Sequence, residues 1–306
     1  MDPGRVSEYN SLLQDDLKLS DDVLISRCLK FGEVPRFVFI KSEELNTEDL
    51  DHAIASRNAL KVISYAKSKS AVREDNYSHR VLQMVPSKTD FRTKFYFDFL
   101  SNHIAETIID QLDQEILQKV SEFAVAHDGD DSGSTSVLRG KIYALLCHKW
   151  FSLPKQHNLV LCPLELKTVR FFRLTDIKAV ENGVYYRPKS KTFGALDAFV
   201  FVDNACYDLQ MTRNRDHGAP LNACIKWLEG VCIATDRLYF SFVVPNHLVH
   251  EFKKQSIGAS SNSESKRPGP TAKVNQFITT LNAIGERGQY CNNPGLEDHV
   301  CRWSKW

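Results

Sequence analysis

Residues 193–217 read FGALDAFVFVDNACYDLQMTRNRDH, and this stretch decides the fold of the second half of the chain. Two apolar runs flank Asp203 and Asn204, which are typical of the centre of a tight turn between antiparallel strands. The pattern therefore predicts a β-hairpin. Polar residues interrupt both strands, because the first contains Asp197 and the second contains Gln210 and Thr212.

The geometry of a hairpin predicts where these polar side chains lie. A two-residue turn at Asp203 and Asn204 sets Asp197 directly opposite Gln210 on the neighbouring strand. Thr212 shares the face of Gln210, because side chains alternate between faces along a strand. A three-residue loop with a bulge would break this parity. We therefore expect one polar cluster of Asp197, Gln210 and Thr212 on an otherwise apolar hairpin.

Two interpretations of this polar cluster follow from the residue types. A carboxylate oxygen and an amide oxygen on adjacent strands can bind Mg²⁺, which takes few protein oxygens and completes its shell with water or phosphate. Such an ion can activate water for attack on a phosphodiester. Alternatively, Asp197 is a core acid whose hydrogen bonds come from neighbouring amides and hydroxyls. Spacing alone is compatible with both.

Length, composition and charge indicate the general class of protein. It has 306 residues, 42% of them hydrophobic and 25% charged, which is typical of a globular protein with one large or two ordinary domains. The formal net charge of +1 excludes a globally basic nucleic-acid binder and leaves room for a local basic face. No run reaches the length of a membrane span or of a signal-peptide core, so we expect no membrane association and no export signal in this chain.

The eight cysteines give little indication of a metal site. None are spaced as CxxC and most lie in apolar runs, which favours reduced core residues in a reducing compartment. Cys291, His299 and Cys301 could supply at most three zinc ligands, at an unfamiliar spacing. We interpret that cluster as part of a surface tail.

A basic segment precedes the hairpin. Residues 149–191 contain nine lysines and arginines against three acids, and Tyr185, Tyr186 and Phe193 are interleaved with the last of them. Basic and aromatic side chains beside a metal site suit binding of a phosphate backbone. An ordinary solvated strand face has the same composition. The nine residues are Lys149, Lys155, Lys167, Arg170, Arg173, Lys178, Arg187, Lys189 and Lys191.

Hydrophobic periodicity predicts a helical first half and an α/β second half. In the first half, residues 24–40 are expected to form a short helix, a glycine turn and an apolar run that begins at a proline. Further helices are expected over 46–70, with Asn46 or Thr47 as cap, and over 102–124. The second half predicts a mixed sheet with flanking helices. Its expected helices are 137–153 and 220–234, and its expected strands are 158–166, 168–174, 184–188, 195–202, 206–212 and 237–245.

Three further segments complete the organisation. Residues 127–136 and 258–273 are polar, Gly- and Ser-containing stretches, typical of linkers. Residues 273–284 are expected to form a last short helix. The segment 127–136 lacks the lysine of a phosphate loop, so we expect no ATP binding there.

Residues 185–217 resemble a known signature. They are similar to the Crinkler and RHS-like effectors, whose toxin domains include a PD-(D/E)xK restriction-endonuclease-like fold. The strand RLYFSFVVP (237–245) resembles a strand of the same families, and the resemblance covers about residues 73–255. The matching positions of the signature are Tyr185, Tyr186, Pro188, Phe193, Asp197, Gln210, Thr212 and His217.

The resemblance also implies a domain organisation. RCLKFGEVPRF (27–37) is similar to the end of a P-loop ATPase module, and YSHRVLQMVP (77–86) to a helical connector. The chain lacks the Walker sequences and the ubiquitin-like translocation domain of those families. The implied parts are an ATPase remnant at 1–72, a helical connector at 73–126, a nuclease-like domain at 137–255, and a linker and C-terminal tail at 256–306.

Site roles follow from the resemblance residue by residue. Asp197 would be the metal-binding acid and Gln210 would replace the second acid, so that the two would hold Mg²⁺. Thr212 stands where many nucleases have a lysine. Ala144 stands where the family usually has a metal-binding Glu, and one carboxylate fewer weakens Mg²⁺ binding.

The function implied is a metal-dependent endonuclease, delivered by a pathogen into a host cell and acting on DNA in the nucleus. The alternative is a catalytically inactive module of the same fold that binds nucleic acid or a host nuclear protein. ATP hydrolysis is not expected. The predicted nucleic-acid contacts are Arg170, Arg173, Tyr186, Arg187, Lys189, Lys191 and His217.

Overall fold

The computed structural model divides into two compact units, each described by itself. The first comprises residues 1–146 with 190–192, and the second comprises 147–189 with 193–306. The boundary falls inside helix α8 (Ser136–Phe151), after the predicted linker at 127–136. The structure describes residues 11, 18–40, 42–55, 59–67, 78–87, 90, 92, 94–126, 135–152, 156–158, 163–165, 167–171, 174–189, 196–214, 237–249, 251–252 and 275–280.

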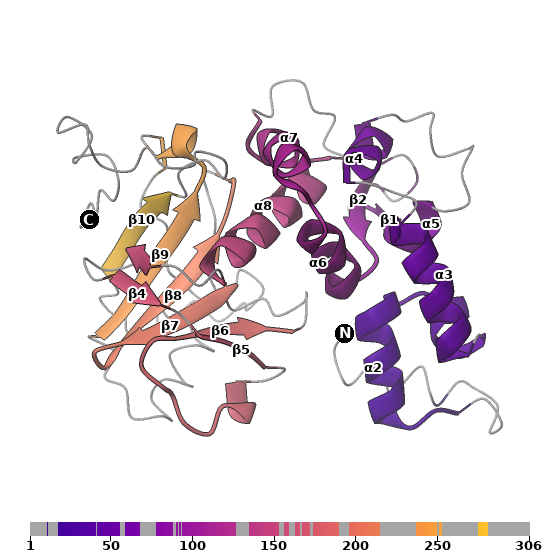
Figure 1. The fold of residues 1–306 in the computed structure, drawn as a ribbon, viewed down its shortest axis with the longest axis horizontal. Coiled ribbons are helices and arrows are strands. Elements are labelled where there is room, and N and C mark those ends of the chain that lie inside the picture. Colours follow the sequence, from indigo (N-terminus) through magenta and orange to yellow (C-terminus); the bar gives the residue numbers. More distant parts are fainter. Residues whose placement is uncertain are drawn as a thin grey trace. The chain divides into compact units, whose positions relative to one another are not determined.

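The described part of the first unit is mainly helical (Figure 1). Its one described hairpin pairs β1 with β2 in antiparallel register. The elements are α2 (Asp21–Phe31), the π-helix η2 (Arg36–Ile40), α3 (Glu43–Ala55), α4 (Ala59–Lys67), α5 (Ser78–Val81), β1 (Leu82–Pro86), β2 (Phe95–Phe99), α6 (Asn102–Asp110), α7 (Gln114–Val125) and the first part of α8.

Capping residues correct two of the predicted helix boundaries. The helix expected at 46–70 is two helices, and α3 begins earlier because Ser42 Oγ accepts a hydrogen bond from Leu45 N at 3.2 Å. The helix expected at 102–124 is also two, because Asp113 Oδ1 accepts from Ile116 N at 2.8 Å and starts α7. Strands β1 and β2 lie where a helical connector was expected, so that expectation was wrong for these residues.

The predicted glycine turn after α2 is confirmed at Gly32. Its φ is 84°, and its N–H donates to Cys28 O at 2.9 Å, which ends the helix. A Cβ at this position would lie 2.5 Å from Leu100 O. Glycine is therefore required both by the backbone conformation and by the close approach of another segment.

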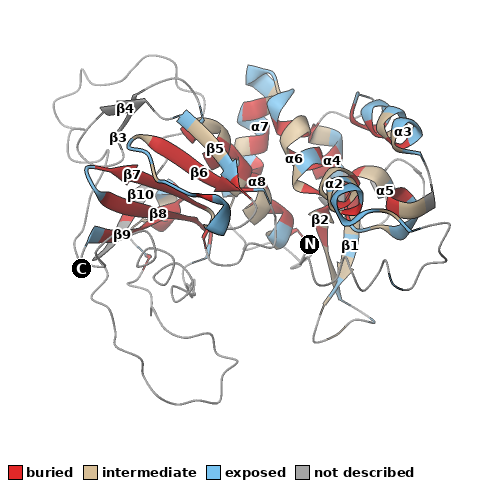
Figure 2. Cartoon of the chain, turned by 90° about the horizontal axis from the view of Figure 1, so that it is seen from below, coloured by how far each residue is buried: buried red, intermediate tan, exposed pale blue. Residues whose placement is uncertain are grey.

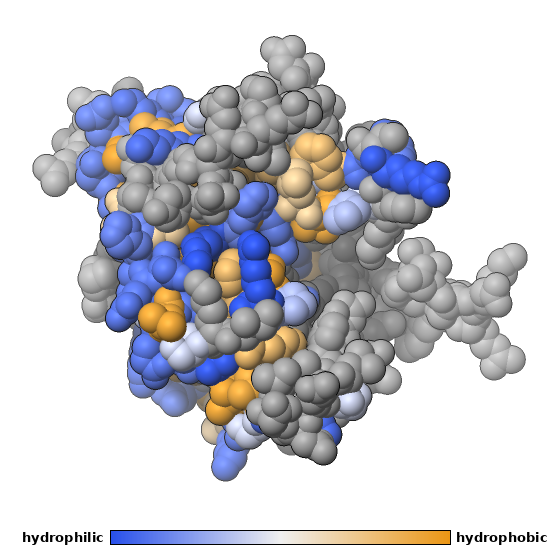
Figure 3. Space-filling model, turned by 90° about the vertical axis from the view of Figure 1, so that its right-hand side faces the viewer, coloured by the Kyte–Doolittle hydropathy of each residue, from blue (hydrophilic) through white to orange (hydrophobic). Residues whose placement is uncertain are grey.

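The exposed apolar side chains described in the first unit are spread over several elements. Among the described residues, the large exposed ones are Val23, Leu45, Met84, Val125 and Val137, from five different elements. On the face drawn in Figure 3, hydrophobic areas are separated by hydrophilic ones. No helix among the described residues is long and apolar enough to cross a membrane.

The second unit is built on a mixed sheet, which confirms the α/β class. The described strands form one sheet in the order β10-β9-β8-β7-β6-β5, in which only β7 runs antiparallel to its neighbours. Short strands β3 (Gln156–Asn158) and β4 (Pro163–Glu165) pair separately. The sheet strands are β5 (Lys167–Phe171), β6 (Val184–Pro188), β7 (Ala198–Val202), β8 (Ala205–Met211), β9 (Leu238–Val244) and β10 (Asn275–Thr280).

Strand β10 corrects the helix expected at 273–284. It pairs in parallel with β9, and Ile278 is buried in the core cluster of the sheet. The strand contains Phe277, Ile278, Thr279 and Thr280, residue types that fit a pleated surface. The sheet therefore extends beyond residue 255, where the predicted domain ended. The expected helix at 220–234 and both linkers lie outside the described residues, apart from residues 135 and 136.

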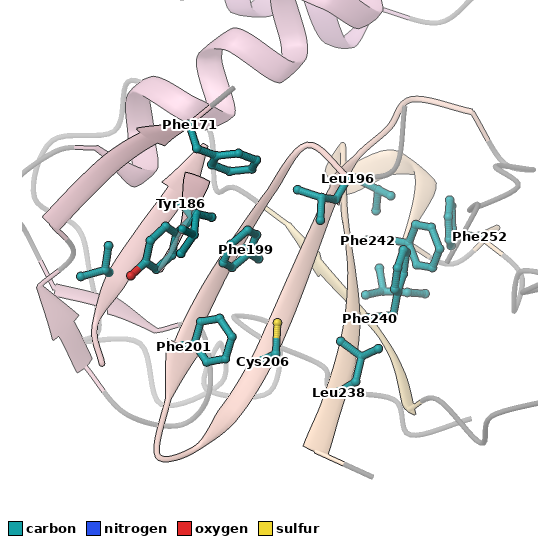
Figure 4. Packing of buried hydrophobic residues seen from close by; sticks show 14 of the residues in the cluster. Phe171, Tyr186, Leu196, Phe199, Phe201, Cys206, Leu238, Phe240, Phe242 and Phe252 are labelled. Atoms are coloured by element: carbon teal, nitrogen blue, oxygen red, sulfur yellow. The ribbon is translucent and has the colours of Figure 1, made fainter. Parts of the chain in front are cut away.

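One face of the sheet forms an aromatic core (Figure 4). Tyr186 stacks on Phe199 with ring centroids 4.8 Å apart, and Phe199 meets Phe201 edge to face. Strands β6, β7 and β8 are buried along their whole length, as Figure 2 shows. A sheet buried on both faces explains why these strands are almost continuously apolar in the sequence.

Candidate functional site

The candidate site lies at one edge of the sheet in the second unit. Strands β5, β6, β8 and β9 run parallel and end at this edge, whereas β7 begins there. Ligands of open α/β sheets bind outside the carboxyl ends of the strands. The described residues at or next to these strand ends include Arg170, Arg187, Lys189, Asp197, Gln210, Thr212 and Arg213.

The predicted pairing of Asp197 with Gln210 is confirmed. Asp203 and Asn204 have φ angles of 49° and 62°, as a two-residue hairpin turn requires, and Val202 pairs with Ala205. The same register brings Asp197 opposite Gln210, whose Nε2 donates to Asp197 Oδ2 at 3.0 Å. The sequence therefore predicted this contact correctly.

Asp197 Oδ2 also accepts a hydrogen bond from the backbone. The N–H of Met211 donates to it at 2.7 Å, so the carboxylate joins the start of β7 to the end of β8. Thr212 is buried on the face of Gln210, and its N–H continues the pairing with β9 by donating to Val243 O at 3.0 Å. Its Oγ1 accepts from Asn214 N at 3.0 Å. The polar groups at this edge are thus hydrogen-bonded to neighbouring residues of the sheet.

This arrangement does not fit a Mg²⁺ site built from protein oxygens. Gln210 turns its amide nitrogen, a hydrogen-bond donor, toward Asp197, and a cation needs oxygen acceptors. No group of three His, Cys, Asp or Glu side chains that could hold a metal occurs among the described residues. Cys291, His299 and Cys301 lie outside those residues. The contacts of Asp197 instead match a carboxylate stabilised by two donors.

Two arginines lie side by side at this edge. Arg170 on β5 and Arg187 on β6 are register partners on adjacent parallel strands, so their side chains share one face. Arg170 is exposed, whereas Arg187 is 7% exposed. We call these two residues the arginine pair. Lys189, exposed beyond the end of β6, adds a third positive charge near the same edge.

The other predicted nucleic-acid contacts have different positions. Tyr186 is buried in the aromatic core, and its hydroxyl accepts from Glu181 N at 2.9 Å, so its ring is not available to a base. Burial raises the pKa of this phenol. Lys167 lies on the opposite face of β5 from Arg170, so the basic residues do not all gather on one face. Arg173, Lys191 and His217 lie outside the described residues.

A buried pair of side chains near the arginine pair was not predicted from the sequence. His148, in the part of α8 that belongs to the second unit, meets the hydroxyl of Tyr185 through Nδ1 at 2.5 Å. Phe151 stacks on the ring of Tyr185, with centroids 5.6 Å apart. Burial raises the pKa of Tyr185 well above its ordinary value of 10. His148 lies four residues after Ala144, so a histidine one turn further along the helix was the available signal.

Ala144 itself is half-buried on α8, in the part of the helix that belongs to the first unit. Its role therefore remains the prediction that the resemblance made. Comparison with protein-family models, with curated proteins and with solved structures finds no match for this chain.

Proposed function

We propose that the second unit is a nuclease-like domain that binds DNA at the carboxyl edge of its sheet. The observation that carries this proposal is the arginine pair, whose members are register partners on adjacent parallel strands, at the same end of the sheet as Asp197 and Gln210. Like charges directly opposite each other on adjacent strands repel, and an anion bound beside them reduces that repulsion. A phosphate group suits this position, because each guanidinium group can donate two parallel N–H hydrogen bonds to phosphate oxygens.

The resemblance to Crinkler and RHS-like effectors supports the same proposal. It implies a restriction-endonuclease-like fold, and the mixed sheet with its antiparallel β7 agrees with such a fold. On this proposal the protein is delivered by a pathogen and acts on DNA in the host nucleus. The donors around Asp197 favour the form that binds DNA without cutting it.

Binding to a short DNA duplex at several salt concentrations tests the proposal. Each phosphate contact releases counterions, so log affinity falls linearly with log salt, with a slope of about −0.9 per contact. Arg187→Gln should weaken binding and make this slope shallower by about one contact. Lys61→Gln is the control, because Lys61 is an exposed lysine on α4 of the first unit. Its slope should match that of the unmodified protein.

The same preparation separates binding from cleavage. Plasmid cutting that requires Mg²⁺ or Mn²⁺, stops with EDTA and is lost in Asp197→Ala would establish the nuclease. Binding that survives both EDTA and Asp197→Ala would establish the inactive form.

A second candidate is a module that binds a host nuclear protein. The stacked and buried aromatic residues of the sheet favour neither partner, but a protein partner would not require the arginine pair. If DNA affinity does not change between low and physiological salt, the DNA proposal fails and the protein partner becomes the better explanation.

A further inference from the structure

The contact between His148 and Tyr185 brings an ionisable ring close to the arginine pair. Tyr185 is wholly buried and His148 is 7% exposed, and the two meet at 2.5 Å. Tyr185 lies two residues before Arg187 on β6, so both side chains share the face on which Phe151 packs. Because Tyr185 is buried, its phenol does not contact a ligand. His148 and Tyr185 therefore influence the DNA-binding site through their charge and position, and not by direct contact.

Charged and ionisable groups from three elements, and one residue that precedes a fourth, act on the phenol of Tyr185. Burial is the largest influence on the pKa of this phenol. The electrostatic influences, in decreasing order, come from Arg187 on β6, Cys147 on α8, Asp197 just before β7 and Arg170 on β5. Two arginines and one carboxylate are among these groups, so positive charge lies near the phenol. A proton added to His148 would increase that charge. An anion at the arginine pair would compensate it.

We infer that a phosphate bound at the arginine pair is accompanied by uptake of a proton from water on His148. The inference rests on the proposed function and adds to it a control of DNA binding by pH. The His148–Tyr185 hydrogen bond persists through this change, because a phenol can donate to a bare ring nitrogen or accept from a protonated one. The transfer involves only this proton, which moves from solvent to the ring.

Linkage gives the direction of the effect. If binding takes up a proton, lower pH must strengthen binding to the same extent, since coupling between two sites is reciprocal. Uptake of one full proton changes the affinity by up to about tenfold per pH unit. We therefore expect DNA affinity to rise several-fold between pH 8 and pH 6.

Calorimetry on the full chain with a short DNA duplex tests the inference. Titrations at one pH in two buffers of different ionisation enthalpy give the number of protons taken up. The unmodified protein should take up a measurable fraction of a proton, and His148→Asn should take up less. Asn is the matched substitution, because its side-chain oxygen can replace Nδ1 as acceptor for the phenol. The control is His79→Gln, an exposed histidine on α5.

The outcomes separate this inference from the proposed function. Equal proton uptake by the unmodified protein and His148→Asn, with DNA binding intact, overturns the inference alone. Failure of the unmodified protein to bind DNA overturns the proposed function and the inference with it. If His148→Asn melts below the assay temperature, the DNA affinity of the unmodified protein is measured between pH 6 and pH 8. An affinity that does not change over this range also overturns the inference.

Discussion

Gln210 donates its side-chain amide hydrogen to Asp197 across the hairpin, over 3.0 Å between Nε2 and Oδ2. The same oxygen accepts from Met211 N at 2.7 Å. Two donors on β8 thus converge on one carboxylate at the start of β7. This accounts for an acid in an apolar hairpin without requiring a bound metal, because hydrogen bonds to a charged acceptor stabilise it.

Asp197→Ala should destabilise the second unit, because it leaves the Gln210 amide and Met211 N–H without this acceptor. The expected loss is about 1–3 kcal/mol of unfolding free energy. Asp197→Asn should lose less, since its oxygen can still accept from Met211 N. Urea unfolding of both variants measures this, and equal losses would contradict the assigned hydrogen bonds.

Gln210→Glu should also destabilise the protein at neutral pH, since two carboxylates would face each other across the hairpin. Stability should recover in acid, where one carboxyl group is protonated. The second carboxylate also supplies a charged oxygen, so Mg²⁺ should raise the melting temperature of this variant more than that of the unmodified protein. Melting curves with and without Mg²⁺ decide this. An identical response of both proteins would argue against a latent cation site.

Gly32→Ala and Gly140→Ala should have opposite effects. At Gly32 the φ of 84° and the 2.5 Å approach of Leu100 O oppose a Cβ, so unfolding free energy should fall by more than about 1 kcal/mol. At Gly140, inside α8, nothing lies within 4 Å of an added Cβ, and alanine should stabilise the helix by about 0.5–1 kcal/mol. Denaturant unfolding of both variants measures the pair. A gain in stability at Gly32 would contradict the described turn.

Tyr185 should make the second unit sensitive to alkali. Burial raises the pKa of its phenol above 10, so folding disfavours the ionised form. The folded state favours the neutral phenol, and this stability is fully present below pH 10, the ordinary pKa. It is lost as the pH rises above that value. Unfolding free energy should fall above pH 10 more steeply for the unmodified protein than for Tyr185→Phe. Parallel pH curves would show that this phenol is not the cause.

Several features of the fold were accessible from local pattern. The hairpin turn, the Asp197–Gln210 pairing and the end of α2 at Gly32 depend on neighbouring residues and on strand alternation, and each was predicted correctly. The helix boundaries at Ser42 and Asp113 were missed, because apolar periodicity continues across a capping residue. The strands β1 and β2 were missed because the helical connector expected there came from the family resemblance, and short apolar runs suit either a helix or a strand.

The sequence by itself determined the hairpin and the mixed α/β class, because the alternation of side chains and the turn residues act over a few positions. Only the tertiary structure decided that Gln210 offers a donor to Asp197, that Tyr186 is a core residue, and that Arg170 lies beside Arg187. It also decided that β10 joins the sheet and that His148 meets Tyr185. These relationships join residues far apart in the chain, and no local periodicity encodes which distant strand or helix becomes a neighbour.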